Sequence, residues 1–393
     1  MKSVYILFAS AVLLSMSCGA KKNNKASAGT KLPVKGDSSI FKPLTPPEKQ
    51  YYHDKAEAAY HKILGSHFNG EILVAKNGQI VYEDYHGVYD FRKKTPITPE
   101  TPMHLASTSK TLTGMAILHL WEEHKLSLDD YIQKYFPAFP YQGITIKMLL
   151  SHRSGLPNYL DFMEKGFPRN RHATNQDVID YMIANRPKPS NLPNRAFQYC
   201  NTNFVILASI LEKVTKMPYP KFMKDSVFMP LGMTHTYVFS IKDTANYIPT
   251  YSGNRPFPMT NIDCTYGDKN IYSTVRDLLK WDRSLYMHTF IKASTLKMAL
   301  VPQSLEHPSM HNYGLAWRTY VNHKTGDSIV YHNGYWHGSN NVFTRFVKDT
   351  ATIILLGNKY NPNNYNAKKI GEIFTGIPDS NDLAPLSESE SGL

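Results

Sequence analysis

The chain has 393 residues, of which 42% are hydrophobic and 19% are charged, and it contains 26 Tyr and 18 Phe. This composition is typical of a packed globular protein and excludes a chain that is disordered throughout. The formal net charge is +12, but half of that excess lies in the first 50 residues, where eight Lys face only Asp37 and Glu48. Because no arginine-rich helix, zinc-finger spacing or aromatic-basic RNA-binding signature accompanies this charge, we expect no nucleic-acid partner, and a basic segment beside a membrane is the simpler interpretation.

The N-terminus is predicted to carry an export signal. An apolar run extends from Val4 to Leu14 and is followed by Ser15-Met16-Ser17-Cys18. The run is shorter than the ~20 residues that span a bilayer, but it matches the apolar region of a secretory signal peptide. Small residues that lead into a cysteine resemble a bacterial lipoprotein box, in which Cys18 is lipidated. The alternative is an ordinary signal peptide with an incidental cysteine.

We therefore predict a signal peptide over residues 1–17 and a lipid anchor at Cys18. Residues 18–49 are rich in Lys, Asn, Ser, Gly and Pro and have no apolar periodicity, which predicts a flexible tether. A lipid chain together with lysines gives two membrane signals. The expected location is the bacterial cell envelope, with the body of the protein lipid-anchored and facing the periplasm.

Residues 70–86 predict an antiparallel hairpin. Two β-rich runs flank Asn77-Gly78, a dipeptide that strongly favours a two-residue hairpin turn. Three more β-rich runs lie near the other end of the chain, at Ser328 to His332, Asn341 to Val347 and Ala351 to Leu356. Since β-rich runs stand near both ends, we expect a single sheet closed by the two chain ends.

Between these β-rich blocks the apolar spacing is helical. The predicted helices cover Lys110 to Glu123, Thr145 to Leu150, Asn175 to Ala184, Asn203 to Thr215, Tyr219 to Phe228 and Thr274 to Tyr286. The predicted fold belongs to the α+β or α/β class: a mainly antiparallel sheet, formed by both chain ends and flanked by helices, with an all-helical insertion over about residues 114–266. We expect this domain to span residues 50–377 and residues 378–393 to form a disordered tail.

Ser107-Thr108-Ser109-Lys110 precedes a strongly apolar helical stretch. Residues three apart share a helix face, so Ser107 and Lys110 would project together from the N-terminal turn. A serine hydroxyl is a poor nucleophile until a base takes its proton, and a lysine in a suitable environment can be that base. The spacing alone is weak, because it recurs at Ser294-Thr295-Leu296-Lys297, where we expect only a helix N-cap and a solvated lysine.

Tyr199-Cys200-Asn201 stands just before a predicted helix. A tyrosine near a lysine could relay a proton to a leaving group, and the asparagine amide could orient the lysine and the substrate. The alternative is a loop tyrosine that packs on the core.

His332-Asn333-Gly334 ends a predicted strand. Glycine permits close approach of a substrate, and the N–H group of Tyr335 would complete an oxyanion hole. Taken alone, His332 is more simply explained as a structural histidine at a strand end.

Together and in this order, the three motifs identify a resemblance to the serine β-lactamase and penicillin-binding-protein superfamily, closest to class C β-lactamases, D,D-carboxypeptidases and related esterases, which use Ser-x-x-Lys, Tyr-x-Asn and Lys/His-x-Gly. The resemblance covers about residues 50–375. Further segments that carry it are Pro-Ile-Thr-Pro-Glu-Thr-Pro before the nucleophile, Leu149 to Leu156, Tyr272-Ser273-Thr274 with Asp277-Leu278, and Tyr313 to Trp317. The family implies acyl-enzyme chemistry on a β-lactamase/transpeptidase-like fold.

The third motif departs from the family pattern. Asn333 replaces the usual Thr or Ser, bulky Tyr335 and Trp336 follow Gly334, and His332 would bind a carboxylate less reliably than a lysine. These changes favour an ester, an amide or a modified peptide over β-lactams and carboxylate-terminated peptides. Lys324-Thr325-Gly326 also matches the family triplet, but its turn-like setting before Asp327 argues against that role.

Other chemistries lack their motifs: the sequence has no Gly-x-Ser-x-Gly elbow, no His-Glu-x-x-His, no phosphate-binding glycine loop and no dinucleotide fingerprint. We expect no cofactor and no metal, and we expect Cys200 and Cys264 to be buried thiols. His152 is predicted to order a turn.

The sequence thus predicts a monomeric, lipid-anchored serine hydrolase acting on a small molecule or peptide. In the family's scheme Ser107 is the nucleophile, Lys110 or Tyr199 is the acylation base, and the N–H groups of Ser107 and Tyr335 hold the oxyanion. Tyr199 then protonates the leaving group and activates the deacylating water. Asn201 and the catalytic His332 position the substrate and protons, and Asn333 and Gly334 contribute to substrate binding. Cell-wall-derived or D-amino-acid peptides are candidate substrates. The rival hypothesis is a non-catalytic envelope protein that binds or senses such ligands.

Overall fold

The computed structural model describes residues 36–65, 68–242, 247–306, 309–321 and 328–375. The predicted signal peptide, Cys18, the Lys324-Thr325-Gly326 triplet and the predicted tail at 378–393 lie outside the described residues. Among the helices that fall within the described ranges, none has both the length and the apolar character needed to cross a membrane.

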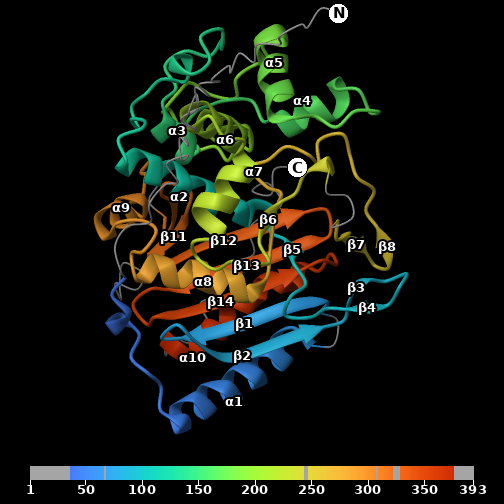
Figure 1. Ribbon diagram of the computed structural model, residues 1–393, viewed down its shortest axis with the longest axis vertical. Coiled ribbons are helices and arrows are strands. Elements are labelled where there is room, and N and C mark those ends of the chain that lie inside the picture. The colour runs from blue at the N-terminus through green and yellow to red at the C-terminus, as the bar shows by residue number, and fades with distance from the viewer. Residues whose placement is uncertain (1–35, 66–67, 243–246, 307–308, 322–327, 376–393) are drawn as a thin grey trace, which may run out of the picture. The chain divides into compact units, whose positions relative to one another are not determined.

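A seven-stranded antiparallel sheet dominates the described part of the chain and is built from both chain ends (Figure 1). Its order is β10-β11-β12-β13-β14-β1-β2. The strands are β1 (Gly70–Lys76), β2 (Gln79–His86), β10 (His311–Tyr313), β11 (Arg318–Val321), β12 (Ser328–Trp336), β13 (Ser339–Phe346) and β14 (Ala351–Gly357). Because β1 pairs with β14, the expected closure of the sheet by the two chain ends is confirmed.

The β1–β2 hairpin forms where the sequence predicts it. Asn77 and Gly78 both have positive φ, at 51° and 65°. Two consecutive residues with positive φ make the turn whose twist matches that of paired strands, and Asn-Gly is the dipeptide that adopts it most readily.

Alternating side chains of the central strands divide the core in two. Ile72 and Val74 of β1 face one layer, and Leu73 and Ala75 face the other. The first layer holds α1 (Pro46–Ile63) and the 3₁₀ helix η7 (Pro362–Gly371); the second holds α2 (Ser109–Glu122) and α8 (Val275–Tyr286). In Figure 1, α8 lies in front of the sheet and α1 lies beyond β2.

The helical insertion gathers above the sheet in Figure 1. Five of the six predicted helices appear as single α-helices with nearly the expected limits. The sixth, predicted from Tyr219 to Phe228, begins as α7 and continues as a π-helix, η5. Elements of this region and its borders are α3 (Ile146–Leu150), α4 (Tyr159–Gly166), α5 (Asn175–Asn185), α6 (Thr202–Thr215), α7 (Tyr219–Phe222), η5 (Met223–Phe228), and, after α8, α9 (Ala293–Ala299) and α10 (Glu372–Thr375). The remaining strands are short: β3 (Val88–Asp90), β4 (Thr95–Pro96), β5 (Met103–His104), β6 (Tyr237–Val238), β7 (Tyr251–Ser252), β8 (Arg255–Pro256) and β9 (Ile271–Ser273). Two 3₁₀ helices, η1 (Ser38–Ile40) and η4 (Ile132–Lys134), also lie in the described ranges.

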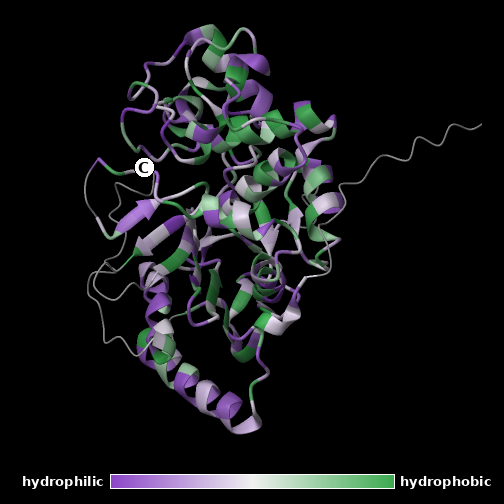
Figure 2. Cartoon of the chain, turned by 90° about the vertical axis from the view of Figure 1, so that its left-hand side faces the viewer, coloured by the Kyte–Doolittle hydropathy of each residue, from purple (hydrophilic) through white to green (hydrophobic). Residues whose placement is uncertain are grey.

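The predicted limit of the tether at residue 49 is wrong, because α1 begins at Pro46. Thr45 and Glu48 form a reciprocal capping box, in which Thr45 Oγ1 accepts from the Glu48 N–H at 3.4 Å and Glu48 accepts from the Thr45 N–H at 2.8 Å. The sequence shows no apolar stripe for this helix, because only Ala56 and Tyr60 are buried along it. Figure 2 shows hydrophilic colouring along most of its length.

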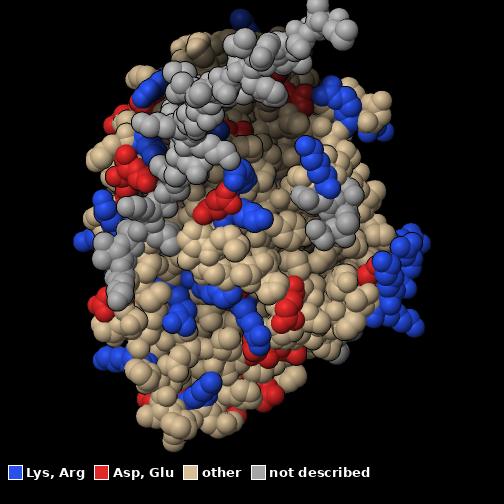
Figure 3. Space-filling view, in the orientation of Figure 1, with Lys and Arg blue, Asp and Glu red and all other residues tan. Residues whose placement is uncertain are grey.

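On the face seen in Figure 3, acidic and basic side chains are interspersed. A cluster of basic side chains lies at the turn between β3 and β4, which contains Arg92, Lys93 and Lys94.

Candidate active site

Ser107 lies in a short 3₁₀ helix, η3 (Ala106–Thr108), which leads directly into α2. Its neighbours Ala106 and Thr108 are fully buried, whereas Ser107 keeps partial access to solvent. Ala106 has φ +48°, a left-handed conformation that is unfavourable for a residue with a Cβ atom. The backbone is therefore turned sharply just before the one side chain of this helix that reaches the surface.

Lys110 is completely buried beside Ser107. Its Nζ donates to Ser107 Oγ at 3.0 Å, to Asn201 Oδ1 at 2.8 Å and to the backbone carbonyl of Asp268 at 2.9 Å. The three partner atoms are all uncharged oxygens. The amine is thus held at hydrogen-bond distance from the hydroxyl whose proton it would accept.

Tyr199 and Asn201 meet the same lysine. The Nζ of Lys110 lies 5.0 Å from the centre of the Tyr199 ring. Asn201 is buried at the start of α6 and directs its carbonyl oxygen to Lys110 rather than capping its own helix. The second predicted motif therefore converges with the first.

His152 fixes the loop that carries Tyr199 and Asn201. It is fully buried at φ +55°, as a turn residue should be, and its Nδ1 accepts from the Cys200 N–H and from Asn203 Nδ2, both at 3.1 Å. Its ring lies 4.3 Å from that of Tyr199. The predicted turn role is confirmed, and the histidine also packs against Tyr199, a contact that the sequence did not indicate.

His332 of β12 closes the other side of the site, with its ring centre 6.3 Å from that of Tyr199. Its Nδ1 lies 2.8 Å from the Asn333 carbonyl oxygen, which can only accept, so Nδ1 carries the proton and Nε2 accepts from the Tyr313 hydroxyl at 3.2 Å. Burial, reinforced by the positive charges of Arg318 and Lys110, holds the pKa of His332 well below its usual range. The imidazole is therefore neutral near pH 7.

Arg318 is a charged member of the site that the sequence analysis missed. It is buried on β11, with its guanidinium carbon 5.3 Å from the centre of the Tyr199 ring and 5.8 Å from that of Tyr313. It pairs in register with Tyr331, directly before His332. A cation thus lies beside the neutral histidine. In the sequence, the only indication of this residue is that Arg318 lies on the strand before the one that carries the third motif.

Gly334 allows β12 to approach the nucleophile. A Cβ atom there would lie 2.3 Å from the Leu105 carbonyl oxygen and 3.1 Å from Thr108 Oγ1. The β11–β12 register ends at Arg318 and Tyr331, so within the described strands residues 332–336 pair only with β13. Alternate residues of an antiparallel strand direct their backbone groups to opposite sides, so this open edge offers N–H and C=O groups to a ligand.

Asn333, the departure from the family triplet, has a buried Oδ1 without a hydrogen-bond partner in the described part of the chain. The two body cysteines are both free. Cys200 is buried as expected, whereas Cys264 is only partly so; burial raises the pKa of each thiol to about 11, so neither is activated as a nucleophile.

Among the described residues, one group of side chains could gather around a metal ion: His53, Asp54 and Glu57 on the outer part of α1. Asp54 and Glu57 are exposed, His53 is half-buried, and the group shares no residue with the site around Ser107. His337 does not belong to this group. It contacts Asp263, with its Nε2 atom 3.2 Å from both carboxylate oxygens.

Comparison with known proteins gives concordant matches. A family model with the description Beta-lactamase matches residues 58–374. Penicillin-binding protein 4* of Bacillus subtilis (strain 168) is 32% identical over 315 residues, which cover 76% of this chain and 70% of that protein.

Two solved structures show the same fold. The octameric penicillin-binding protein homologue from Pyrococcus abyssi has a TM-score of 0.71 at 24% identity, covering 85% of this chain and 79% of that one. The D-amino acid amidase from Ochrobactrum anthropi SV3, solved in complex with D-phenylalanine, has a TM-score of 0.67 at 19% identity, covering 83% of this chain and 99% of that one.

Proposed function

Because the chain belongs to the beta-lactamase family and is a serine hydrolase of the β-lactamase and penicillin-binding-protein type, we propose that it hydrolyses an ester, amide or peptide bond through an acyl-enzyme on Ser107. The observation that carries this assignment is the 3.0 Å contact between Lys110 Nζ and Ser107 Oγ, in a site that also contains Tyr199 and His332.

In the acylation step, Ser107 Oγ attacks the substrate carbonyl carbon as its proton passes to a base. Lys110 is in hydrogen-bond contact with the hydroxyl, and Tyr199 is the alternative base. The N–H groups of Ser107 and Tyr335 stabilise the negative oxygen of the tetrahedral intermediate. The intermediate collapses when the bond to the leaving group breaks and the leaving group takes a proton, which we assign to Tyr199.

Deacylation reverses the roles of these groups. A water molecule loses its proton to Tyr199 and attacks the acyl carbon, and the Ser107 oxygen recovers a proton as the ester bond breaks. Asn201 holds Lys110 in place throughout, because its carbonyl oxygen is 2.8 Å from Nζ. His332 and Asn333 position the substrate along the open edge of β12.

The charges near the third motif bear on the substrate. His332 is neutral, so it does not supply the positive charge that a lysine would supply in its place. The positive charge of Arg318, which is buried on β11, acts on it. We propose amides or short peptides of D-amino acids as the substrate class, which fits the fold shared with a D-amino acid amidase.

The matched pair of Ser-x-x-Lys segments provides the test. Ser107→Ala should abolish turnover of a nitrophenyl ester by the purified protein, whereas Ser294→Ala should leave it unchanged. Repeated turnover by the wild type distinguishes an enzyme from a sensor, which would be acylated once. Full activity of Ser107→Ala would overturn the assignment.

We also propose that the mature protein is anchored in the bacterial envelope through Cys18. Metabolic labelling with a palmitate analogue should mark the wild type and not Cys18→Ala. Equal labelling of the two proteins would refute the anchor.

A further inference from the structure

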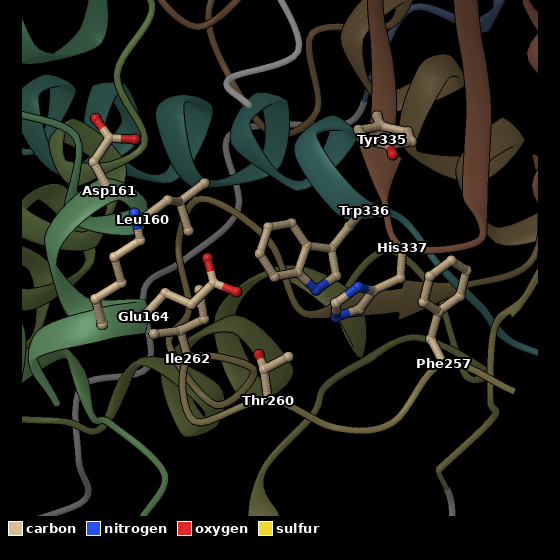
Figure 4. Close-up of a pocket in the computed structure, with 10 residues that line it drawn as sticks. Leu160, Asp161, Glu164, Phe257, Thr260, Ile262, Tyr335, Trp336 and His337 are labelled. Carbon is tan, nitrogen blue, oxygen red and sulfur yellow. The ribbon is translucent and has the colours of Figure 1, made fainter. Parts of the chain in front are cut away.

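A cavity of about 440 Å³ lies beside the proposed oxyanion strand (Figure 4). One wall is formed by Tyr335, Trp336 and His337, at and just beyond the end of β12, together with Phe257. The facing wall comes from α4. Because Tyr335 lines the cavity, the cavity adjoins the strand whose N–H group is the proposed oxyanion donor.

The aromatic wall is held rigidly from behind. Trp336 Nε1 donates to Asp263 Oδ1 at 2.9 Å, and His337 contacts both oxygens of the same carboxylate. Phe257 stacks on His337, with ring centres 5.2 Å apart and an interplanar angle of 22°. Although burial alone would raise the pKa of Asp263, its contacts with His337 and the Thr260 N–H keep it below the ordinary value, so the anchor is ionised. The aromatic surface is therefore in place before a ligand binds.

A carboxylate faces this wall. Figure 4 shows the side chain of Glu164 directed from α4 toward the Trp336 indole, whereas Asp161 points away from it. Within the described residues, neither carboxylate has a hydrogen bond or an ion pair. Lys165 is the cationic side chain of the lining, and its charge acts on Asp161.

The residues behind the aromatic wall do not reverse the excess of negative charge in the cavity. Asp263 and Asp268 stand there against Lys269, whose Nζ lies 3.5 Å from Asp268 and 4.8 Å from the centre of a Trp336 ring. Cavity and backing layer together hold four carboxyl side chains and two lysines: Asp161, Glu164, Asp263, Asp268, Lys165 and Lys269. The field in the cavity favours a cation.

We propose that this cavity binds a protonated amine of the substrate, between the Glu164 carboxylate and the face of the aromatic wall. Ammonium groups bind well to the π-faces of aromatic rings, and a charge-assisted hydrogen bond to Glu164 makes the site selective for a positively charged group. The inference rests on the proposed function and deepens it: the preferred substrates carry a free amine near the scissile carbonyl, as an unblocked amino acid amide does.

The test compares two probes of the same shape, phenethylamine and phenethyl alcohol, by ligand-observed NMR titration of the whole protein at pH 7. The amine should bind about tenfold more tightly than the alcohol. Glu164→Gln should remove that preference, and Glu57→Gln, which changes an exposed carboxylate on α1, should retain it.

Equal affinity of the two probes, absence of binding by both, or a preference that survives Glu164→Gln would each overturn the inference. Because the titration needs no turnover, its failure is separate from that of the proposed function, which would show as an inactive wild type. If the amine binds more tightly than the alcohol, substrates with a free amine should also be hydrolysed more efficiently than substrates without one. The value of kcat/KM for D-phenylalanine p-nitroanilide should exceed that for its N-acetyl derivative, and Glu164→Gln should reduce the ratio about tenfold.

Discussion

Two segments of this chain share the pattern Ser-x-x-Lys but have different surroundings. At Ser107 the preceding residue is strained, the lysine is fully buried, and Lys110 Nζ contacts Ser107 Oγ, Asn201 and the Asp268 carbonyl. At Ser294 both the serine and Lys297 are exposed on α9. The comparison shows that burial and partners from distant segments, and not the spacing of the pair, hold the Lys110 amine against the Ser107 hydroxyl.

Replacing the lysine of each pair gives the largest expected difference. Lys110→Met keeps a long side chain but removes the amine, so kcat for a nitrophenyl ester should fall by about 10²–10⁴-fold, the usual loss when a general base is removed. Lys297→Met should stay within twofold of the wild type. Similar losses in both variants would mean that the two segments do not differ as described.

Asn201→Ala tests the partner that distinguishes the buried pair. Without the amide oxygen, Lys110 loses one of three acceptors and its fixed position, and kcat should fall roughly 10–100-fold, comparable to the loss of one strong hydrogen bond to a charged group. The far-ultraviolet circular dichroism spectrum serves as the folding control. Unchanged kcat would show that Asn201 does not position the lysine.

The neutral state of His332 predicts a pH effect on stability. Its pKa is lowered in the folded protein, so below about pH 6.5 the unfolded chain binds a proton that the folded chain does not, and the free energy of unfolding decreases as the pH falls. His332→Gln should reduce this slope by about 1.4 kcal/mol per pH unit between pH 6 and 5. The measurement is urea denaturation of both proteins at these two pH values.

The comparison with the variant is necessary because other buried groups also titrate. His104 and His152 have lowered pKa values and act in the same direction. Glu71, whose pKa is raised by burial, acts in the opposite direction. Identical slopes for the wild type and His332→Gln would contradict a neutral buried His332.

The smallest effect is expected at the helix starts. Ser294 was predicted to cap its helix, but the N-cap of α9 is Lys292 and no side chain caps it, so Ser294→Ala should change the free energy of unfolding by less than about 0.5 kcal/mol. Thr45→Ala, which breaks the capping box of α1, should cost about 1 kcal/mol. Urea denaturation measures both values, and a reversed order would contradict these cap assignments.

Much of the fold could be predicted because local chemistry determines it. Asn77-Gly78 needs only its own backbone preferences to turn a hairpin, and the apolar spacing of α2 and α6 is evident without tertiary contacts. The start of α1 was missed because the helix buries few residues and so shows no apolar stripe, although Thr45 and Glu48 have the spacing of a capping box.

The site could be predicted only in part. Its three motifs were found from their sequence patterns, but Arg318 and the Asp268 carbonyl belong to no motif and become neighbours of Tyr199 and Lys110 only through strand register and loop packing. A backbone carbonyl has no sequence signature, since every residue carries one. The cavity beside Tyr335 likewise depends on how α4 faces the end of β12.

The most direct test of the central claim is to locate the acyl group by mass. The protein would be treated with a fluorophosphonate and its adduct identified by intact mass and peptide mapping. We predict one adduct on Ser107, retained in Ser294→Ala and absent in Ser107→Ala. An adduct on another residue, or an undiminished adduct in Ser107→Ala, would contradict the account.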